Sequence, residues 1–356
     1  MSRVDKLRQK MREKDLDAVL IYDGLNQHYL SGFAFTDGFL LITHSEAFLV
    51  TDFRYFEHAE KEAFSQFKVL IPSNRKEFVL KAFTDSNCKK VGFEGSFVSY
   101  NLYRRLCEDF SLCEFINIGD MVEQLRRFKD NEELKMMQSA QDITDRAFSA
   151  LLDRITPDMT EIEVAAELEY LIRRDGASGL AFDTIAVSGD ASSLPHGVPR
   201  NVKLKKGFFT LDFGAKYKGY CSDMTRTLVI GKADEEMKKL YNTVLSAQLA
   251  ALDYLKPGVQ CELVDKKARD IIESHPEYKG TFGHSLGHSV GLFIHESPRL
   301  SVNSKGMIAK IGDIYTVEPG IYLVGKYGCR IEDMVTITEN GIYNFTKSTK
   351  ELIEIC

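Results

Sequence analysis

The sequence lacks the features of three common classes of protein. Its seven cysteines are odd in number and form no CxxC pair, which argues against a disulfide scaffold and for a reducing compartment. No apolar run approaches the length needed to span a membrane. The opening stretch SRVDKLRQKMREKDLD is charged and helical in period, without the apolar segment of a signal peptide or a transit-peptide composition. We therefore expect a cytoplasmic protein without a membrane partner.

The chain also lacks an excess of positive charge. Its formal net charge is -6, and no stretch concentrates lysine and arginine. Because binding to a nucleic-acid backbone needs such a basic surface, we expect no nucleic-acid partner. With 44% hydrophobic and 28% charged residues in 356, the composition is that of an ordinary globular protein with room for two domains, each with its own core.

Residues 1–127 alternate short apolar strand patterns with helical patterns, which predicts an α/β domain of about 120 residues. We find no catalytic constellation in this part. The charged connector RRFKDNEEL then leads into a long helix that starts near Asn131. We place the boundary at about Phe128, giving an N-terminal domain over 1–127 and a catalytic domain over 128–356.

The second part contains an internal echo. Residues 152–157, LDRITP, align with residues 252–257, LDYLKP, and each copy reads as helix, proline-containing turn and helix, followed by strands. Such turns can recur by chance. The alternative is a duplicated half-domain whose two copies face each other across a pseudo-twofold axis. A site built between such halves would draw residues from both.

Three of the eight histidines lie in the stretch TFGHSLGHSVGLFIHESP, residues 281–298. Imidazole is the commonest neutral metal ligand and the commonest general acid or base. The three side chains, His284, His288 and His295, could also be solvated and without a role. A matching set of carboxylates elsewhere in the chain would favour a functional site.

The first half supplies two such carboxylates. Asp212 lies in the apolar strand pattern FFTLDF, and Asp223 lies on a second strand pattern after the turn at residues 216–219. By period-2 alternation, Asp212 shares a face with Thr210, and Asp223 shares a face with Thr225. Two carboxylates of one hairpin can therefore point at one spot.

The second half supplies Glu318 in TVEPG and Glu332 in CRIEDMVTI. Strand parity places Glu332 on the face of Arg330 and Asp333 on the opposite face. Asp333 is thus the weaker candidate for a ligand, and a capped or salt-bridged carboxylate is its ordinary interpretation.

Carboxylates within apolar strands are costly to bury unless their charge is compensated, and four together would repel one another. Two divalent cations would cancel four negative charges. Carboxylates and one imidazole suit Mn(II), Co(II) or Zn(II), so a dinuclear site with ions about 3.5–4 Å apart explains the set. The alternative is four unrelated structural carboxylates.

With these motifs in view, the sequence resembles the M24-type metallopeptidases, the group of aminopeptidase P, prolidase and methionine aminopeptidase with the pita-bread fold. HSLGHSVGLFIHE resembles the proline-peptidase signature, and DFG, the following aspartate, EPG and RIED match the remaining ligand motifs in order. SGFAFTDGFLLIT and TDFRYFEHAEKE resemble the family's N-terminal domain, which methionine aminopeptidases lack. The resemblance covers essentially the whole chain. It implies an α/β N-terminal domain and an α+β pita-bread catalytic domain with an internal pseudo-twofold repeat.

The resemblance also implies a ligand set. Asp212 and Asp223 would hold one metal ion, with Asp223 bridging to the second ion. His288 and Glu318 would complete the shell of one ion, and Glu332 would bridge. A hydroxide between the metals would be the nucleophile and Glu318 the general base. The expected cofactor is a pair of divalent ions, with Mn(II) preferred over Co(II) or Zn(II).

The remaining polar candidates follow from the flanking motifs. His196 in SSLPHGVP matches a histidine-bearing loop beside the substrate, and His295 matches the family's second histidine, which stabilises the tetrahedral intermediate. Arg330 is a candidate for orienting either a ligand carboxylate or the terminus of the substrate. Thr225 is a plausible hydroxyl supporting the ligands, and His284 has no assigned role beyond the wall of the site.

Two departures from the family pattern, Ser289 and Phe293, bear on substrate preference because neither is a ligand position. The resemblance implies hydrolysis of the bond between an N-terminal residue and a following proline, in peptides or dipeptides, by a metallo-exopeptidase that forms a homodimer. The alternatives are a non-catalytic binding module on the same fold and a methionine aminopeptidase-like exopeptidase.

Overall fold

The computed structural model describes residues 1–356, and the chain divides into two compact units, Met1–Arg126 and Arg127–Cys356. Each unit is described by itself. No helix combines the length and the hydrophobicity needed to span a bilayer.

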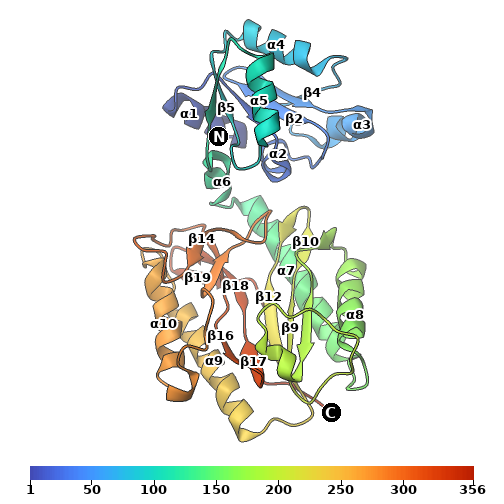
Figure 1. Ribbon diagram of the computed structural model, residues 1–356, viewed down its shortest axis with the longest axis vertical. Coiled ribbons are helices and arrows are strands. Elements are labelled where there is room, and N and C mark those ends of the chain that lie inside the picture. The colour runs from blue at the N-terminus through green and yellow to red at the C-terminus, as the bar shows by residue number, and fades with distance from the viewer. The chain divides into compact units, whose positions relative to one another are not determined.

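The first unit is a six-stranded sheet among six helices (Figure 1). The sheet order is β4-β3-β2-β1-β5-β6. Its strands are β1 (Ala18–Ile21), β2 (Phe39–Thr43), β3 (Ala47–Val50), β4 (Lys68–Leu70), β5 (Lys90–Phe93) and β6 (Glu114–Asn117). Its helices are α1 (Arg3–Glu13), α2 (Gly24–Ser31), α3 (Phe53–Glu62), α4 (Arg75–Asp85), α5 (Tyr100–Asp109) and α6 (Met121–Arg126).

The second unit repeats one order of elements, a helix pair followed by strands. The first copy contains α7 (Asn131–Leu152), α8 (Glu161–Arg174), β7 (Gly179–Leu180), β8 (Ile185–Ser188), the 3-10 turn η1 (Gly189–Ser193), β9 (Gly207–Phe213), β10 (Ala215–Tyr217), β11 (Tyr220–Cys221) and β12 (Met224–Ile230). The second copy contains α9 (Glu235–Tyr254), α10 (Cys261–Glu273), the 3-10 turn η2 (Pro276–Tyr278), β13 (Gly287–Ser289), β14 (Glu296–Leu300), β15 (Ile314–Val317), β16 (Gly320–Leu323), β17 (Tyr327–Arg330) and β18 (Asp333–Thr338). Two short strands, β19 (Gly341–Asn344) and β20 (Glu354–Ile355), follow.

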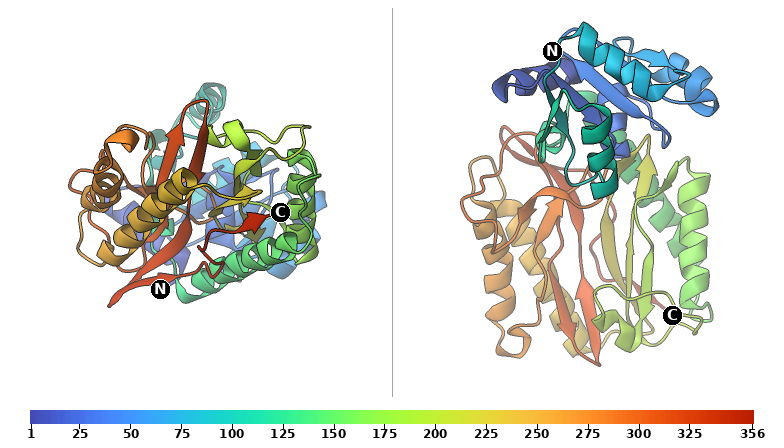
Figure 2. Two further views of the ribbon diagram at one scale, coloured as in Figure 1. Left: turned by 90° about the horizontal axis from the view of Figure 1, so that it is seen from below. Right: turned by 45° about the horizontal axis from the view of Figure 1, so that its top comes forward.

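The strands of the second unit lie between the two helix pairs, with α7 and α8 on one side and α9 and α10 on the other (Figures 1 and 2). The sequence of strand β9 is almost continuously apolar because the strand is buried on both faces. Phe208 packs into the core under α9 and α10, while Phe209 packs into the core under α7 and α8. A strand buried on both faces needs apolar residues at successive positions, so a polar residue inside it stands out.

Candidate metal centre

The two aspartates of the first half lie on one face of a hairpin. Strands β9 and β12 pair antiparallel, with Asp212 opposite Thr225. Asp223 comes immediately before β12, two residues from Thr225, and therefore lies on the same face. Between the two aspartates, the short strands β10 and β11 meet at the expected turn and form a separate small sheet with β7.

The carboxylates of the second half lie at breaks between strands, where the sequence pattern predicted strand interiors. Glu318 falls between β15 and β16, and Glu332 falls between β17 and β18, which belong to different sheets. His288 lies in β13, where a register shift follows it. Breaks and bulges free a side chain from the alternation of the sheet and let it point into a cavity.

These residues meet in a cavity of about 680 Å³ within the second unit. Residues of both halves line it, as expected for a site built between two repeated halves. The lining includes all the expected metal ligands and catalytic residues, together with His284: His196, Asp212, Asp223, His284, His288, His295, Glu318, Arg330 and Glu332.

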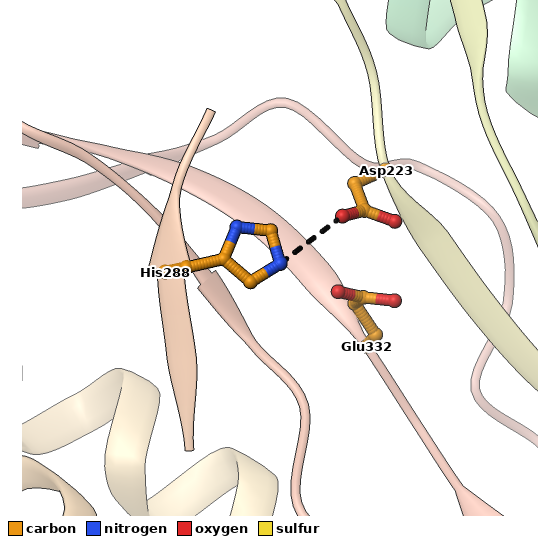
Figure 3. Close-up of side chains that lie close together, drawn as sticks. All are labelled: Asp223, His288 and Glu332. Atoms are coloured by element: carbon orange, nitrogen blue, oxygen red, sulfur yellow. Dashed lines mark ion pairs between the residues drawn. The ribbon is translucent and has the colours of Figure 1, made fainter. Parts of the chain in front are cut away.

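The centre of the cluster is formed by Asp223, His288 and Glu332, whose side chains point toward one another (Figure 3). One potential ligand atom from each lies within 4.8 Å of the others. His288 Nε2 is 3.6 Å from Asp223 Oδ2 and 3.6 Å from Glu318 Oε1. The three residues are between 2% and 6% exposed, so the cluster is shielded from bulk water.

The orientation of the His288 ring is fixed from outside the cluster. Its Nδ1 lies 3.0 Å from the carbonyl oxygen of Ser289, and its backbone N–H donates to Thr316 Oγ1. A proton on Nδ1 leaves Nε2 as an unprotonated nitrogen that faces the carboxylates. Burial lowers the pKa of His288 to about 3, so the ring is neutral at physiological pH.

The carboxylates of the cluster disfavour ionisation of one another. Burial, followed by the charges of Glu332 and Asp212, raises the pKa of Asp223 well above its usual value. Burial and then Glu318 and Asp212 do the same to Glu332. Burial raises the pKa of Glu318 to about 8, although Arg330 opposes the shift. Desolvated like charges in one cavity need a cation or protons for compensation.

Arg330 donates from all three of its guanidinium nitrogens, and two of these bonds reach the first half. Nη2 donates to Asp212 Oδ2 at 2.6 Å, Nε to Thr225 Oγ1 at 3.0 Å, and Nη1 to the hydroxyl oxygen of Tyr322 at 2.7 Å. Thr225 Oγ1 in turn donates to Glu332 Oε2 at 2.7 Å. Arg330 is 4% exposed. Its bond to Asp212 is of the kind that the first of its two expected roles, orienting a ligand carboxylate, requires.

The donor set fits divalent cations. Asp212 Oδ1 is buried and accepts no hydrogen bond, although a buried carboxylate oxygen normally has a partner. It shares the cavity with the expected ligands Asp223, Glu318 and Glu332 and with the neutral imidazole of His288, and carboxylates and imidazole are the oxygen and nitrogen donors that Mn(II), Co(II) and Zn(II) accept. Cations at this position would compensate the repulsion between the carboxylates.

The three other histidines surround this cluster. The rings of His288 and His295 meet edge to face with centroids 4.5 Å apart. Burial lowers the pKa of His295, and the charges of Arg299 and His196 add to the shift. His196 lies on the loop after η1, on the cavity wall. His284 Nε2 is 2.9 Å from the hydroxyl oxygen of Tyr322, and burial lowers the pKa of His284 to about 4.

Tyr322 is a further residue of the site that none of the sequence motifs indicates. It is 8% exposed, and its hydroxyl joins Arg330 to His284. Its position two residues after the EPG motif is the only signal for it in the sequence, and an apolar strand such as GIYL gives a tyrosine no particular meaning.

Glu332 and Asp333 are adjacent in the sequence, but their side chains lie in different environments. Asp333 points away from the cavity, where it accepts a 2.8 Å bond from Arg226 Nη2 and a 2.6 Å bond from Lys350 Nζ. Burial opposes the ionisation of Asp333, but Arg226 and Lys350 outweigh it and hold its pKa below the usual value. The ordinary interpretation of Asp333 as a salt-bridged carboxylate is confirmed.

A cluster of four carboxylates and one imidazole, buried at its centre and shared by two repeated halves, is the donor set of a metal-binding protein. Residues 135–339 match metallopeptidase family M24, and residues 3–128 match the creatinase/prolidase N-terminal domain. The chain therefore belongs to metallopeptidase family M24 and is a metallopeptidase. The expected family and fold class are both confirmed.

Relatives resemble the chain over nearly its full length. A solved structure titled Xaa-Pro dipeptidase from Bacillus anthracis is 40% identical, covers 99% of each chain and has a TM-score of 0.94. An X-Pro aminopeptidase structure from Thermotoga maritima is 37% identical, covers 98% of this chain and 100% of its own, and has a TM-score of 0.92. A Xaa-Pro dipeptidase of Pyrococcus furiosus is 38% identical and covers 99% of each chain.

Proposed function

We propose that this metallopeptidase hydrolyses the bond between an N-terminal residue and a following proline, in dipeptides or longer peptides, with two divalent ions. The observation that carries the proposal is the convergence of four carboxylates and the neutral His288 in one cavity. Similarity to solved proteins titled Xaa-Pro dipeptidase and X-Pro aminopeptidase supports the substrate class.

In this proposal, the residues that would hold the two ions are Asp212, Asp223, His288, Glu318 and Glu332. Asp223, His288 and Glu332 lie at the centre of the cluster, so the carboxylates of Asp223 and Glu332 would be within reach of both ions. Mn(II) is the proposed metal, with Co(II) and Zn(II) as alternatives. When bound, such ions lower the pKa of water and polarise the scissile carbonyl.

The side chains around the ligands then have separate tasks. Thr316 Oγ1 donates to Glu318 Oε1 at 3.2 Å, which leaves Oε2 to take a proton from the attacking water. His295, packed against His288, is proposed to stabilise the tetrahedral intermediate. His196 is proposed to contact the scissile amide. Arg330 is proposed to fix Asp212 directly and Glu332 through Thr225.

The preference for proline has a chemical rationale. The amide before proline carries no N–H, and proline restricts the backbone of the preceding residue. A peptidase that depends on that N–H or on a free choice of conformation handles the bond badly. A dedicated site is therefore a reasonable solution.

The test is an assay of purified protein, stripped with a chelator and reloaded with Mn(II), Co(II) or Zn(II). The substrates are Xaa-Pro, Xaa-Pro-Yaa and the matched Xaa-Ala and Xaa-Ala-Yaa peptides. We expect cleavage of at least one proline peptide, dependent on metal, with the alanine peptides cleaved more slowly. The ratio between the two proline substrates defines the preferred length. No cleavage of either proline peptide by any reloaded form would overturn the proposal.

We further propose that residues 1–127 form an N-terminal domain and residues 128–356 the catalytic domain. The division of the chain into two compact units supports this organisation.

We also propose that the protein is a homodimer in the cytoplasm. Its seven free thiols are compatible with a reducing compartment. Sedimentation equilibrium of the purified chain in the analytical ultracentrifuge tests the dimer.

A further inference from the structure

A buried carboxylate outside the metal cluster organises one wall of the cavity. Glu161, the first residue of α8, is fully buried. Its Oε2 accepts from the backbone N and from Nε of Arg200, at 2.9 and 2.8 Å. Its Oε1 accepts from Arg200 Nη2 at 2.6 Å and from the backbone N and Oγ of Ser188, both at 2.8 Å. One carboxylate thus joins a helix start, a strand end and Arg200.

Arg200 directly follows the segment that carries His196 and anchors its end. The segment 195–199, PHGVP, lies on the cavity wall. At its start, the carbonyl oxygen of Pro195 accepts from Arg330 Nη1 at 3.3 Å, and at its end stands Arg200. In between, Gly197 packs so tightly on the strand β8 that an added Cβ would lie 2.8 Å from Val187 Cγ1.

Both ends of the segment are anchored, and its two prolines fix φ, so the position of His196 depends on where the anchors lie. Arg330, which holds the start of the segment, also holds Asp212. Glu161, which holds the end of the segment through Arg200, has no contact with the ligand set. We infer that Glu161 and Arg200 are positioning residues that hold His196 against the substrate, an inference that rests on the proposed peptidase function.

The other half contains a counterpart. On α10, Asp265 is fully buried and accepts from Arg269 Nε at 3.0 Å and from the backbone N of Leu286 at 2.9 Å. Arg269 donates to the carbonyl oxygens of Phe282 and His284, at 2.6 and 3.0 Å. In each half, an acidic residue near the start of the second helix thus pairs with an arginine and holds a loop that brings a histidine to the cavity. This recurrence supports a role in placing histidines.

The first measurement is kcat/KM on a proline peptide for the metal-loaded wild type, Glu161→Gln, His196→Ala and the double variant. The glutamine keeps the shape but cannot accept all five bonds, and a small displacement of a substrate-contacting group is costly. We expect kcat/KM to fall about 10- to 100-fold in Glu161→Gln, with the bound metal per chain unchanged.

The double variant distinguishes positioning from general support. If Glu161 acts through His196, then Glu161→Gln lowers the activity of His196→Ala by no more than about twofold. The same change in a His284→Ala background should keep its full effect. Equal, fully additive losses in the two backgrounds, or an unchanged kcat/KM in Glu161→Gln, would overturn the inference.

A matched control lies on the same two segments. Asp158 and Lys203 form an exposed pair at 2.9 Å, three residues before Glu161 and three after Arg200. Asp158→Asn should leave kcat/KM unchanged. If Glu161→Gln does not fold, Arg200→Lys replaces it, because lysine keeps the charge but loses the two-pronged geometry. Arg200→Lys should show the same dependence on His196, and its absence would count against the inference.

A second readout does not depend on peptidase activity. The sequence contains no tryptophan. The substitution Val198→Trp, two residues after His196, therefore gives the chain a single indole in the anchored segment. Because Val198 is 76% exposed, the readout is the fluorescence anisotropy of this indole, which should fall when Glu161→Gln is added, as the segment becomes more mobile, and stay unchanged with Asp158→Asn. Unchanged anisotropy in both would overturn the inference, whereas a fall in anisotropy together with no Xaa-Pro cleavage by the metal-loaded wild type would refute only the proposed function.

Discussion

The two halves of the second unit repeat one order of elements, but they supply the metal centre in different ways. The first half contributes Asp212 and Asp223 from one hairpin whose long strands pair over seven residues each. The second half contributes His288, Glu318 and Glu332 from the bulge or breaks of strands three to six residues long. The repeated scaffold therefore brings two faces together, while local irregularities in one half aim the side chains.

The largest expected effect is the loss of activity when either half loses a central ligand. Asp223→Asn and Glu332→Gln each remove a charge that we propose to be shared by both ions. Since the ions would supply several kcal/mol of transition-state stabilisation, kcat/KM of the metal-loaded enzyme should fall by about 10³-fold or more in each variant. A much smaller loss in one of the two variants would show that its half is not required for binding the catalytic ions. Steady-state assays at saturating metal measure this.

Neutralising Asp333 should lower the stability of the metal-free protein, whereas neutralising the adjacent Glu332 should not. Asp333 is 1% exposed and paired with Arg226, so Asp333→Asn leaves a buried guanidinium without its partner and should lower the free energy of unfolding by about 3–5 kcal/mol. Glu332→Gln removes a buried like charge and should not lower the stability of the metal-free protein. Urea unfolding of the metal-free variants gives both values, and a stability loss in Glu332→Gln equal to that in Asp333→Asn would contradict the assignment.

The metal-free protein should become less stable as the pH rises from 6 to 9. The pKa of Glu318 is about 8 in the folded chain, above its ordinary value of 4.5. Between these values the folded state binds more protons than the unfolded state, so the free energy of unfolding falls with pH until Glu318 is ionised. Denaturant unfolding at several pH values measures the slope. The slope should be smaller in Glu318→Gln and should shrink when Mn(II) is added, and an unchanged slope in both cases would refute the account.

Removal of the hydroxyl that joins Arg330 to His284 should have a moderate effect. Tyr322→Phe keeps the packing of the ring but deletes the bonds to both residues. Because changes to groups that orient ligands typically cost 10- to 100-fold, we expect kcat/KM to fall about 10-fold. Parallel measurement of bound metal separates an effect on catalysis from an effect on affinity.

The smallest expected effect concerns the dynamics of the two halves. Chelation should loosen the short strands that carry His288, Glu318 and Glu332 more than the β9–β12 hairpin, because the hairpin is held by its own ladder. Hydrogen exchange before and after chelation should therefore show a greater loss of protection in segments 287–289 and 314–333 than in 207–230. Equal losses would mean that the halves do not differ in this respect.

Much of the site could be predicted because its residues interrupt local patterns. A single aspartate within FFTLDF is conspicuous in a strand that is otherwise buried on both faces, and period-2 alternation correctly placed it on one face with Asp223 and Thr225. The opposite orientations of Glu332 and Asp333 also followed from parity, although the chain breaks between β17 and β18 at that point. The parity survived because only two residues separate the strands.

What could not be predicted depends on contacts between distant segments. Glu161 and Arg200 are ordinary residues at a helix start and in a loop, and only the fold brings them together. Helix α2 is likewise not predictable from its local sequence. Its sequence, GLNQHYLS, has little apolar periodicity, but the side chain of Asp23 accepts from the backbone N of Leu25, and the buried Glu94 accepts from Asn26 Nδ2. Tertiary contacts override weak local propensity here.

The most direct test of the central claim, that the two halves jointly bind a pair of catalytic ions, is a metal titration. Chelator-treated protein would be titrated with Mn(II), and bound metal per chain and activity on a proline peptide followed together. We predict about two ions per chain in the wild type, activity that appears as the sites fill, and loss of both in Asp223→Ala. Fewer than about one ion per chain, with no effect of Asp223→Ala on binding, would contradict the claim.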